Sequence, residues 1–288
     1  MTWFFLSLSA AFCMASNSAY LKRFFSDVSP WEMSIIPFLY AAPLCAIGLL
    51  FVDKPEIGPG FYPAMAWVLP LTMVGFILHY RAIHLSPLSL TLPFLSFTPV
   101  FVLVSGDLIL HETLSLPGMA GMLLVVAGGY VINLDSARFG ILGPIKAIFR
   151  EPGSLLMLIV AAIYALTSVG GKVMIIHSSP MYTSMLLFSL LGLLIPLVLI
   201  GTGKASARAV TRKPLLAMGS GLILFCEVLS HNMAMSMAAA AYMITIKRMA
   251  GIFSVIYGRV LFKERGISYR LAGTLIMTAG AAAIVIYG

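Results

Sequence analysis

The chain has 288 residues, of which 60% are hydrophobic and only 10% are charged. Soluble domains carry about 25% charged residues, so this composition excludes a protein whose whole surface faces water. The formal net charge of +8 does not indicate a nucleic-acid partner, because most of the basic residues lie in short loops between apolar runs. There they act as a membrane-topology signal and can contact anionic lipid.

Ten apolar runs follow one another along the chain, each long enough to cross a hydrocarbon core of about 30 Å as a helix. Such runs are too long for strands, and only a helix satisfies its own backbone hydrogen bonds in lipid. We interpret the first run as a membrane helix and not as a removable signal, since it has no basic lead or cleavage site. The predicted spans are 2–21, 31–51, 62–80, 88–110, 117–133, 154–175, 181–200, 214–236, 239–262 and 269–287.

The longest polar connection lies between the fifth and the sixth predicted span. We expect a short interfacial helix in it, around Ile141–Phe149. This connection divides the chain into a first unit, residues 1–134, a connecting cytoplasmic loop, residues 135–153, and a second unit, residues 154–288. Each unit holds five predicted spans.

The two units are similar in sequence. The identical pairs are His79 and His231, Ala82 and Ala234, Phe101 and Phe253, Gly106 and Gly258, Glu112 and Glu264, Gly121 and Gly273, and Gly128 and Gly280 at a shift of 152, with Lys22 and Lys172, Ser29 and Ser179, and Pro30 and Pro180 at a shift of 150. Because five spans are an odd number, the second unit enters the membrane from the opposite side. The expected fold is an all-α membrane protein of ten transmembrane helices arranged as two inverted five-helix repeats.

The loop charges predict the orientation. With ten spans both termini lie on one side, whose loops hold a single basic residue, Lys54, whereas the loops of the other side hold thirteen. Basic loops remain in the cytoplasm, so we expect both termini outside. We also expect a multi-pass protein of the plasma membrane, the inner membrane in a bacterium.

Motifs near the end of each unit resemble a known family. They are Thr98-Pro-Val-Phe101, Gly106, His111-Glu-Thr-Leu-Ser115, Gly121 and Gly128 in the first unit, and Gly251-Ile-Phe253, Gly258, Phe262-Lys-Glu264, Gly273 and Gly280 in the second. These stretches are similar to the EamA-type repeat of the drug/metabolite transporter superfamily. The resemblance implies a central cavity and a transporter of small metabolites, not an enzyme. Many members have cytoplasmic termini, opposite to the orientation that the loop charges predict here.

Two cations, Lys247 and Arg248, lie near the middle of the ninth predicted span. A charge at that depth costs roughly 2.5–3.5 kcal/mol on insertion scales, so it requires a reason. A guanidinium matches a carboxylate or a phosphate, and an ammonium adds a point charge, which favours an anion site. The pair also resembles the phosphate-translocator branch of the superfamily, whose Lys-Arg pair holds the substrate phosphate and whose third helix has a histidine, as His79 here.

Glu227 supports a different interpretation. It lies at a similar depth in the eighth predicted span and could pair with Lys247 or Arg248 without any ligand. In that case the chain could export amino acids or cationic drugs or metabolites, with Glu227 as their ligand or as the carrier of a coupling proton. Both interpretations hold together if Glu227 neutralises one cation and the substrate the other.

The two equivalent histidines could face the cavity as donors or proton carriers, or be neutral rings bonded to neighbouring helices. Their neighbours Tyr80 and Asn232 are candidate cavity donors. The predicted substrate site therefore consists of Lys247, Arg248, His79, His231, Glu227, Tyr80 and Asn232.

Other charged residues are expected to have structural roles. Lys22 and Lys172 are expected to snorkel to the interface, and Glu112 and Glu264 to cap the turns into the helices that follow them. No nucleotide fingerprint, nucleophile motif or metal-ligand spacing is present, so we expect no catalytic residue, cofactor or metal. The sequence therefore predicts a secondary active transporter, a monomer or homodimer, that moves a small organic anion by alternating access.

Overall fold

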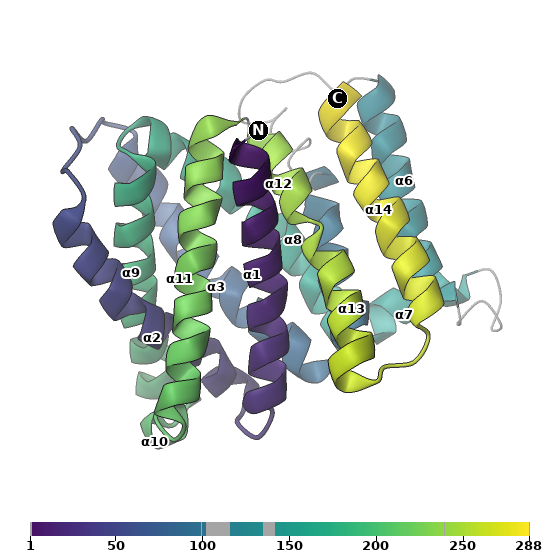
Figure 1. Ribbon diagram of the computed structural model, residues 1–288, viewed down its shortest axis with the longest axis horizontal. Helices are drawn as coiled ribbons and strands as arrows, with labels where there is room; N and C mark the ends of the chain where they lie inside the picture. The colour runs from purple at the N-terminus through teal and green to yellow at the C-terminus, as the bar shows by residue number, and fades with distance from the viewer. Residues whose placement is uncertain (1, 99, 102–115, 135–141, 239, 288) are drawn as a thin grey trace.

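The computed structural model describes residues 2–98, 100–101, 116–134, 142–238 and 240–287. These residues form helices and connections, with no strand among them. Both termini lie at one end of the helix bundle (Figure 1). We call this end, with connections 52–60 and 177–179, the termini end. We call the opposite end, with connections 25–29, 86–87, 202–213 and 263–266, the basic end.

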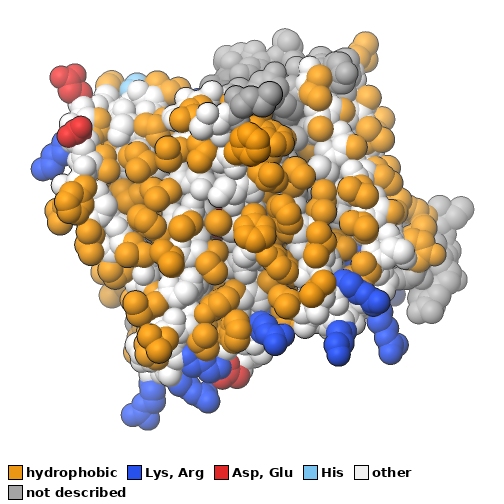
Figure 2. Space-filling model, viewed as in Figure 1, with side chains coloured by type: hydrophobic (Ala, Val, Ile, Leu, Met, Phe, Trp, Pro, Cys, Tyr) orange, Lys and Arg blue, Asp and Glu red, His pale blue; other side chains and the backbone are white. Residues whose placement is uncertain are grey.

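Side-chain chemistry differs between the ends and the middle of the visible face. Figure 2 shows lysine and arginine side chains gathered along the basic end, while hydrophobic side chains cover the middle of this face. This distribution is the one expected for a protein whose middle lies in lipid and whose basic loops lie in the cytoplasm.

The first unit contains helices at each of its predicted spans. They are α1 (Thr2–Phe24), α2 (Pro30–Phe51), α3 (Phe61–Leu85), α4 (Leu88–Thr91), η1 (Leu92–Phe97) and α6 (Leu116–Ile132). Local sequence fixes the start of α2, where Ser29 and Glu32 form a capping box and Pro30 occupies the first turn. The end of the predicted span 88–110, with Glu112 beyond it, lies outside the described residues.

The second unit and the segment before it are also helical. The helices are α7 (Gly143–Arg150), α8 (Pro152–Ile176), α9 (Pro180–Gly201), α10 (Ala207–Val210), α11 (Pro214–Met237), α12 (Ala240–Lys247), α13 (Ala250–Phe262) and α14 (Ile267–Tyr287). The expected interfacial helix is α7. The ninth span is not one helix as predicted, since it is interrupted at Arg248 and Met249 between α12 and α13.

Six of the described helices are long and apolar enough to cross a membrane: α1, α2, α3, α8, α9 and α11. The chain is therefore an all-α membrane protein. The count of ten spans stays a prediction, because the helices at the fourth and ninth predicted spans are divided into shorter pieces.

The helices pack in pairs that join the two units. α1 packs on α11, α3 on α8, α2 on α9 and α6 on α14. In the last pair the backbones touch, since a Cβ atom on Gly128 would lie 2.6 Å from the Gly273 carbonyl oxygen, and one on Gly280 would lie 2.7 Å from that of Gly121. Such contacts between small residues are typical of helices that associate in lipid.

Candidate functional site

A cavity lies between α3, α8, α9 and α11, with an empty volume of about 840 Å³ that includes its mouth. Its lining reaches Ile175, near the end of α8, and Thr183, near the start of α9. Both positions belong to the termini end, so the cavity extends from the middle of the bundle toward that end. Its deeper part contains Glu227, Lys247 and Arg248.

A buried ion pair forms one side of the deep part. The Lys247 ammonium lies 2.8 Å from the Glu227 carboxylate, with 8% and 5% of the two residues exposed. Lys247 also lies 3.2 Å from Nδ1 of His231. An ammonium group can only donate, so Nδ1 accepts and the neutral ring carries its proton on Nε2. The depth match between Glu227 and Lys247 that the sequence suggested is present as a direct contact.

Arg248 has a different environment. It is 4% exposed, and its guanidinium donates to the carbonyl oxygens of Ile244 (3.2 Å) and Leu95 (3.1 Å) and to the Thr98 hydroxyl (3.1 Å). All three acceptors are neutral, and no carboxylate of the described residues lies within 4 Å of it. The charged side chains that line the cavity therefore sum to one excess positive charge.

The break between α12 and α13 positions these two cations. The Arg248 amide donates to the carbonyls of both Ile244 and Thr245, and the Gly251 amide donates to the Arg248 carbonyl at 3.0 Å. This tightened turn replaces regular helix at the deep end of the cavity. Irregular backbone at membrane depth is tolerated where it is buried in protein or lines a cavity.

The remaining predicted residues divide into two groups. His231 and Asn232 line the cavity, whereas His79 and Tyr80 do not. His79 is buried, lies 3.3 Å from the Ser18 hydroxyl and packs against the ring of Tyr164. The structure therefore brings five of the seven predicted residues to one cavity, and the substrate role of each stays a prediction.

The sequence reasoning missed two hydroxyl groups in the cavity wall. The Tyr164 hydroxyl and Thr72 Oγ1 are buried and have no hydrogen-bond partner among the described residues. Beside them, the rings of Phe76, Tyr164 and Phe188 form an aromatic wall, with centroids 5.4 Å and 5.9 Å from that of Phe76. The sequence gives little indication that these residues line a cavity, because threonine, tyrosine and phenylalanine are common in membrane helices.

Two sequence comparisons bear on the identity of this protein. Residues 1–134 match the model of the EamA-like transporter family. An uncharacterized transporter of Archaeoglobus fulgidus is 23% identical over 279 residues, which cover 94% of this chain and 93% of the relative. The chain is a membrane transporter whose first 134 residues are similar to the EamA-like transporter family. It is a multi-pass protein that we assign to the plasma membrane, where a transporter has a small-molecule substrate and membrane lipids as partners.

A comparison of folds gives one further match. A solved crystal structure superposes on the transporter with a TM-score of 0.69 and 15% sequence identity, covering 99% of this chain and 97% of the other. At this identity the match shows that the fold is shared along nearly the whole length. The matching family is one of transporters, which is consistent with the expectation that the chain is not an enzyme.

Proposed function

We propose that this transporter is a secondary active carrier that moves a small organic anion, bearing a carboxylate or a phosphate, by alternating access. The observation that carries the proposal is the Arg248 guanidinium, which lines the cavity and has only neutral acceptors among the residues that the structure describes. A buried charge without a counter-charge is costly, and an anionic guest would supply the missing partner. Lys247 is already neutralised by Glu227, so a guest with one net negative charge fits best.

The proposed guest has an apolar or aromatic body. Phe76 and Phe188 offer ring faces on the wall of the cavity. The Tyr164 and Thr72 hydroxyls, which have no partner within the described part of the chain, offer donors to a neutral acceptor. This combination of mostly apolar lining with a few placed polar groups is typical of small-molecule sites. The proposed pose places the acidic group at Arg248 and the body toward α3 and α9.

The resemblance to the phosphate-translocator branch supports a phosphate as the acidic group, with one difference. In the described conformation Lys247 contacts Glu227, and His79 does not line the cavity. To bind a phosphate with two negative charges, Lys247 would have to leave Glu227 and contact the phosphate instead. A carboxylate or a singly charged phosphate requires no such exchange.

For the transport step we propose ten transmembrane helices in two inverted five-helix repeats. The packing supports this arrangement, because α1 on α11 and α3 on α8 are the same contact with the units exchanged. Carriers of this kind expose a site near the bilayer midplane alternately to each side as one repeat rocks against the other. The interrupted helix α12–α13 at Arg248 is also typical of such sites.

The test measures binding and uptake with the purified protein in vesicles. Anionic metabolites should raise the melting temperature and be taken up, and Arg248→Gln should abolish both effects. The double variant Glu227→Gln/Lys247→Met removes the ion pair without leaving an unpaired charge, so it should retain anion binding. Stabilisation by cations alone, or anion uptake unaffected by Arg248→Gln, would overturn the proposal.

A second candidate is export of amino acids or cationic metabolites, coupled to protons through Glu227. The observation that favours it is that Glu227 lines the cavity. A cationic guest must then compete with Lys247, which contacts the carboxylate at 2.8 Å. The same double variant distinguishes the two functions, since it removes the only carboxylate described in the cavity lining and would abolish cation transport.

A further inference from the structure

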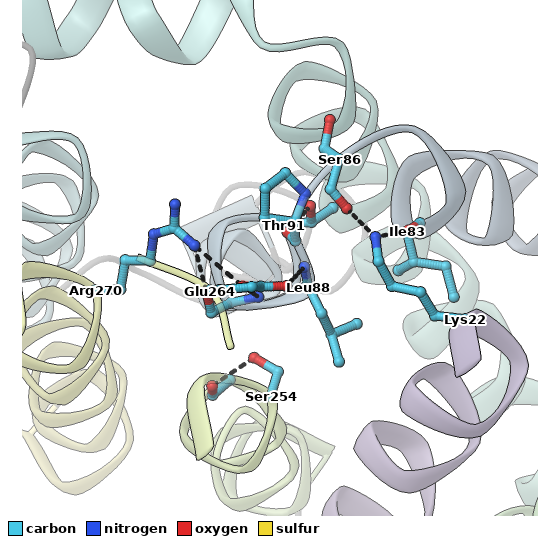
Figure 3. A network of polar contacts seen from close by, with 11 residues as sticks. Lys22, Ile83, Ser86, Leu88, Thr91, Ser254, Glu264 and Arg270 are labelled. Carbon is cyan, nitrogen blue, oxygen red and sulfur yellow. Dashed lines mark hydrogen bonds and ion pairs between the residues drawn. The ribbon is translucent and has the colours of Figure 1, made fainter. Parts of the chain in front are cut away.

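A network of polar contacts lies at the basic end of the bundle (Figure 3). The Lys22 ammonium, in the last turn of α1, donates to the carbonyls of Ile83 (2.6 Å) and Ser86 (2.5 Å), at the end of α3. The Ser86 hydroxyl donates to the carboxylate of Glu151 and accepts the amide hydrogen of Gly153 at 3.0 Å. These contacts tie the end of α3 to α1 on one side and to the start of α8 on the other.

The second half of the network involves Glu264, in the connection from α13 to α14. Its carboxylate accepts the amide hydrogens of Leu88 (2.9 Å) and Ser89 (3.2 Å), at the start of α4, and the hydroxyl hydrogen of Ser89. Arg270, in the first turn of α14, lies 3.1 Å from the carboxylate and donates to the Ser89 hydroxyl at 2.5 Å. Residues of both units therefore meet around the connection from α3 to α4.

Local structure holds Glu264 in place. Lys263 adopts a left-handed conformation with φ of 52°, and the Glu264 amide donates to the Gly258 carbonyl at 2.9 Å. The left-handed residue ends α13 and turns the chain. The side chains of Glu264 and Arg270 are 9% and 16% exposed, so the contact is largely sheltered from water.

The termini end repeats one part of this arrangement. Lys172, the sequence equivalent of Lys22, donates to the carbonyls of Met235 (2.9 Å) and Ala238 (3.4 Å), at the end of α11. In both units a lysine therefore binds the carbonyl end of the helix two spans later. A cation at that position also complements the helix dipole.

Glu264 corresponds to Glu112, which lies outside the described residues, but the hydroxyl and guanidinium groups of the network have no chemical equivalent in the opposite unit. At the shift of 152, Ser86 corresponds to Ala238, Ser89 to Ala241 and Arg270 to Gly118. Neither alanine has a hydroxyl group, and glycine has no side chain to replace the guanidinium. The sequence therefore supplies the hydroxyl and guanidinium contacts at the basic end only.

We propose that Lys22, Ser86, Ser89, Glu264 and Arg270 form a latch that closes the basic end and makes the conformation open toward the termini end the favoured one. The cavity reaches the termini end and Ser254, near the network in Figure 3, is fully buried. Two conformations that were equal in contacts would be equally populated, and contacts made in one of them alone shift the balance toward it. The inference rests on the proposed alternating access, but on no particular substrate.

The test uses cysteine accessibility in the full-length protein, with Cys13, Cys45 and Cys226 replaced. One reporter is Ser168→Cys in the cavity lining, and the other is Ser254→Cys beneath the latch. A soluble maleimide should label position 168 rapidly and position 254 slowly. Adding Ser89→Ala, which installs the residue of the opposite unit, and Arg270→Ala should raise labelling at 254 and lower it at 168. Each charge-assisted hydrogen bond removed should change the ratio of the two rates by about tenfold.

Arg212→Ala is the matched control, because it removes one positive charge from the same end but only an exposed contact with Asp27 at 3.5 Å. In this control the ratio of the labelling rates at positions 254 and 168 should equal that of the parent protein. An unchanged ratio in the latch variants, or an equal rise at both reporters, would overturn the proposal. Labelling needs no substrate, so the latch can fail while anion uptake persists, and anion uptake can fail while the latch holds.

Discussion

The cavity and the latch are both buried clusters of charged and hydroxyl groups, but they differ in how completely their hydrogen bonds are made. In the latch, Glu264 accepts from two amides, a hydroxyl and Arg270. In the cavity, Arg248 has only neutral partners and the Tyr164 hydroxyl has none among the described residues. Fully satisfied networks make a structure rigid, whereas an unsatisfied group is stabilised by whatever later supplies its partner. This difference agrees with the two proposed roles, in which the latch stabilises one conformation and the cavity binds a guest.

The largest expected effect tests the satisfied cluster. Glu264→Ala leaves Arg270 without its carboxylate and the amides of Leu88 and Ser89 without an acceptor. Breaking such a buried pair costs about 3–5 kcal/mol of folding free energy, measurable as a lower melting temperature in detergent. Glu56→Ala, at an exposed position of the termini end, should leave the melting temperature unchanged. If Glu264→Ala were as stable as this control, the latch would not be more stabilising than the cavity cluster.

A smaller effect in the opposite direction is expected at the cavity. Arg248→Met removes a buried cation that has no carboxylate partner among the described residues, so the melting temperature of the empty protein should stay the same or rise. Affinity for the anion should fall about 100-fold, equivalent to ~2.7 kcal/mol. A thermal scan of the purified protein without ligand measures the first quantity, and a titration with ligand measures the second. A strong loss of stability in the empty protein would mean that Arg248 is mainly structural.

Tyr164→Phe sharpens the comparison within the cavity wall. It deletes a hydroxyl that has no described partner, so stability without ligand should be unchanged or slightly increased. A guest that accepts a hydrogen bond from this hydroxyl should lose about 1 kcal/mol of binding, or fivefold in affinity. Equal affinities of the variant and the parent would show that the guest does not contact this hydroxyl.

The smallest expected effect lies in an exposed contact at the basic end. The hydrogen bond from Lys213 lowers the pKa of Asp27 below its usual value of 3.8. A lowered pKa in the folded state means that this contact stabilises the fold above the ordinary carboxyl pKa and stops doing so as pH falls through the folded value. Because the pair is exposed, Asp27→Asn should cost less than about 1 kcal/mol at neutral pH. The difference from the parent should disappear in acid, and a large difference at neutral pH would contradict this assignment.

Sequence reasoning located the helices because membrane spans are encoded locally. Each predicted span coincides with one helix or with a pair of helices. For the span 88–110 this holds for its first part, which is the part that the structure describes. The depth match of Glu227 and Lys247 was also visible, since residue counts along neighbouring spans give depth directly. The interruption at Arg248 was not predicted, because no proline or glycine marks it.

Contacts between the units were beyond what the sequence could predict. Lys22 and Lys172 were expected to snorkel, which is wrong, because each binds the carbonyl end of another helix. Glu264 was expected to cap the turn that follows it, yet it binds the start of α4 in the other unit. Residue type shows that a charge needs a partner, but the partner is chosen by which helices pack together.

The close contact of α6 with α14 limits how the molecule can move. At Gly128 and Gly273 the two backbones meet without any side chain between them, so neither helix can slide or turn without a collision. Under the proposed alternating access, a motion that opens the cavity toward the basic end must therefore keep α6 and α14 together as one unit. The other helices must then change their positions. The junction of α12 and α13, where the helix is interrupted, is the expected hinge.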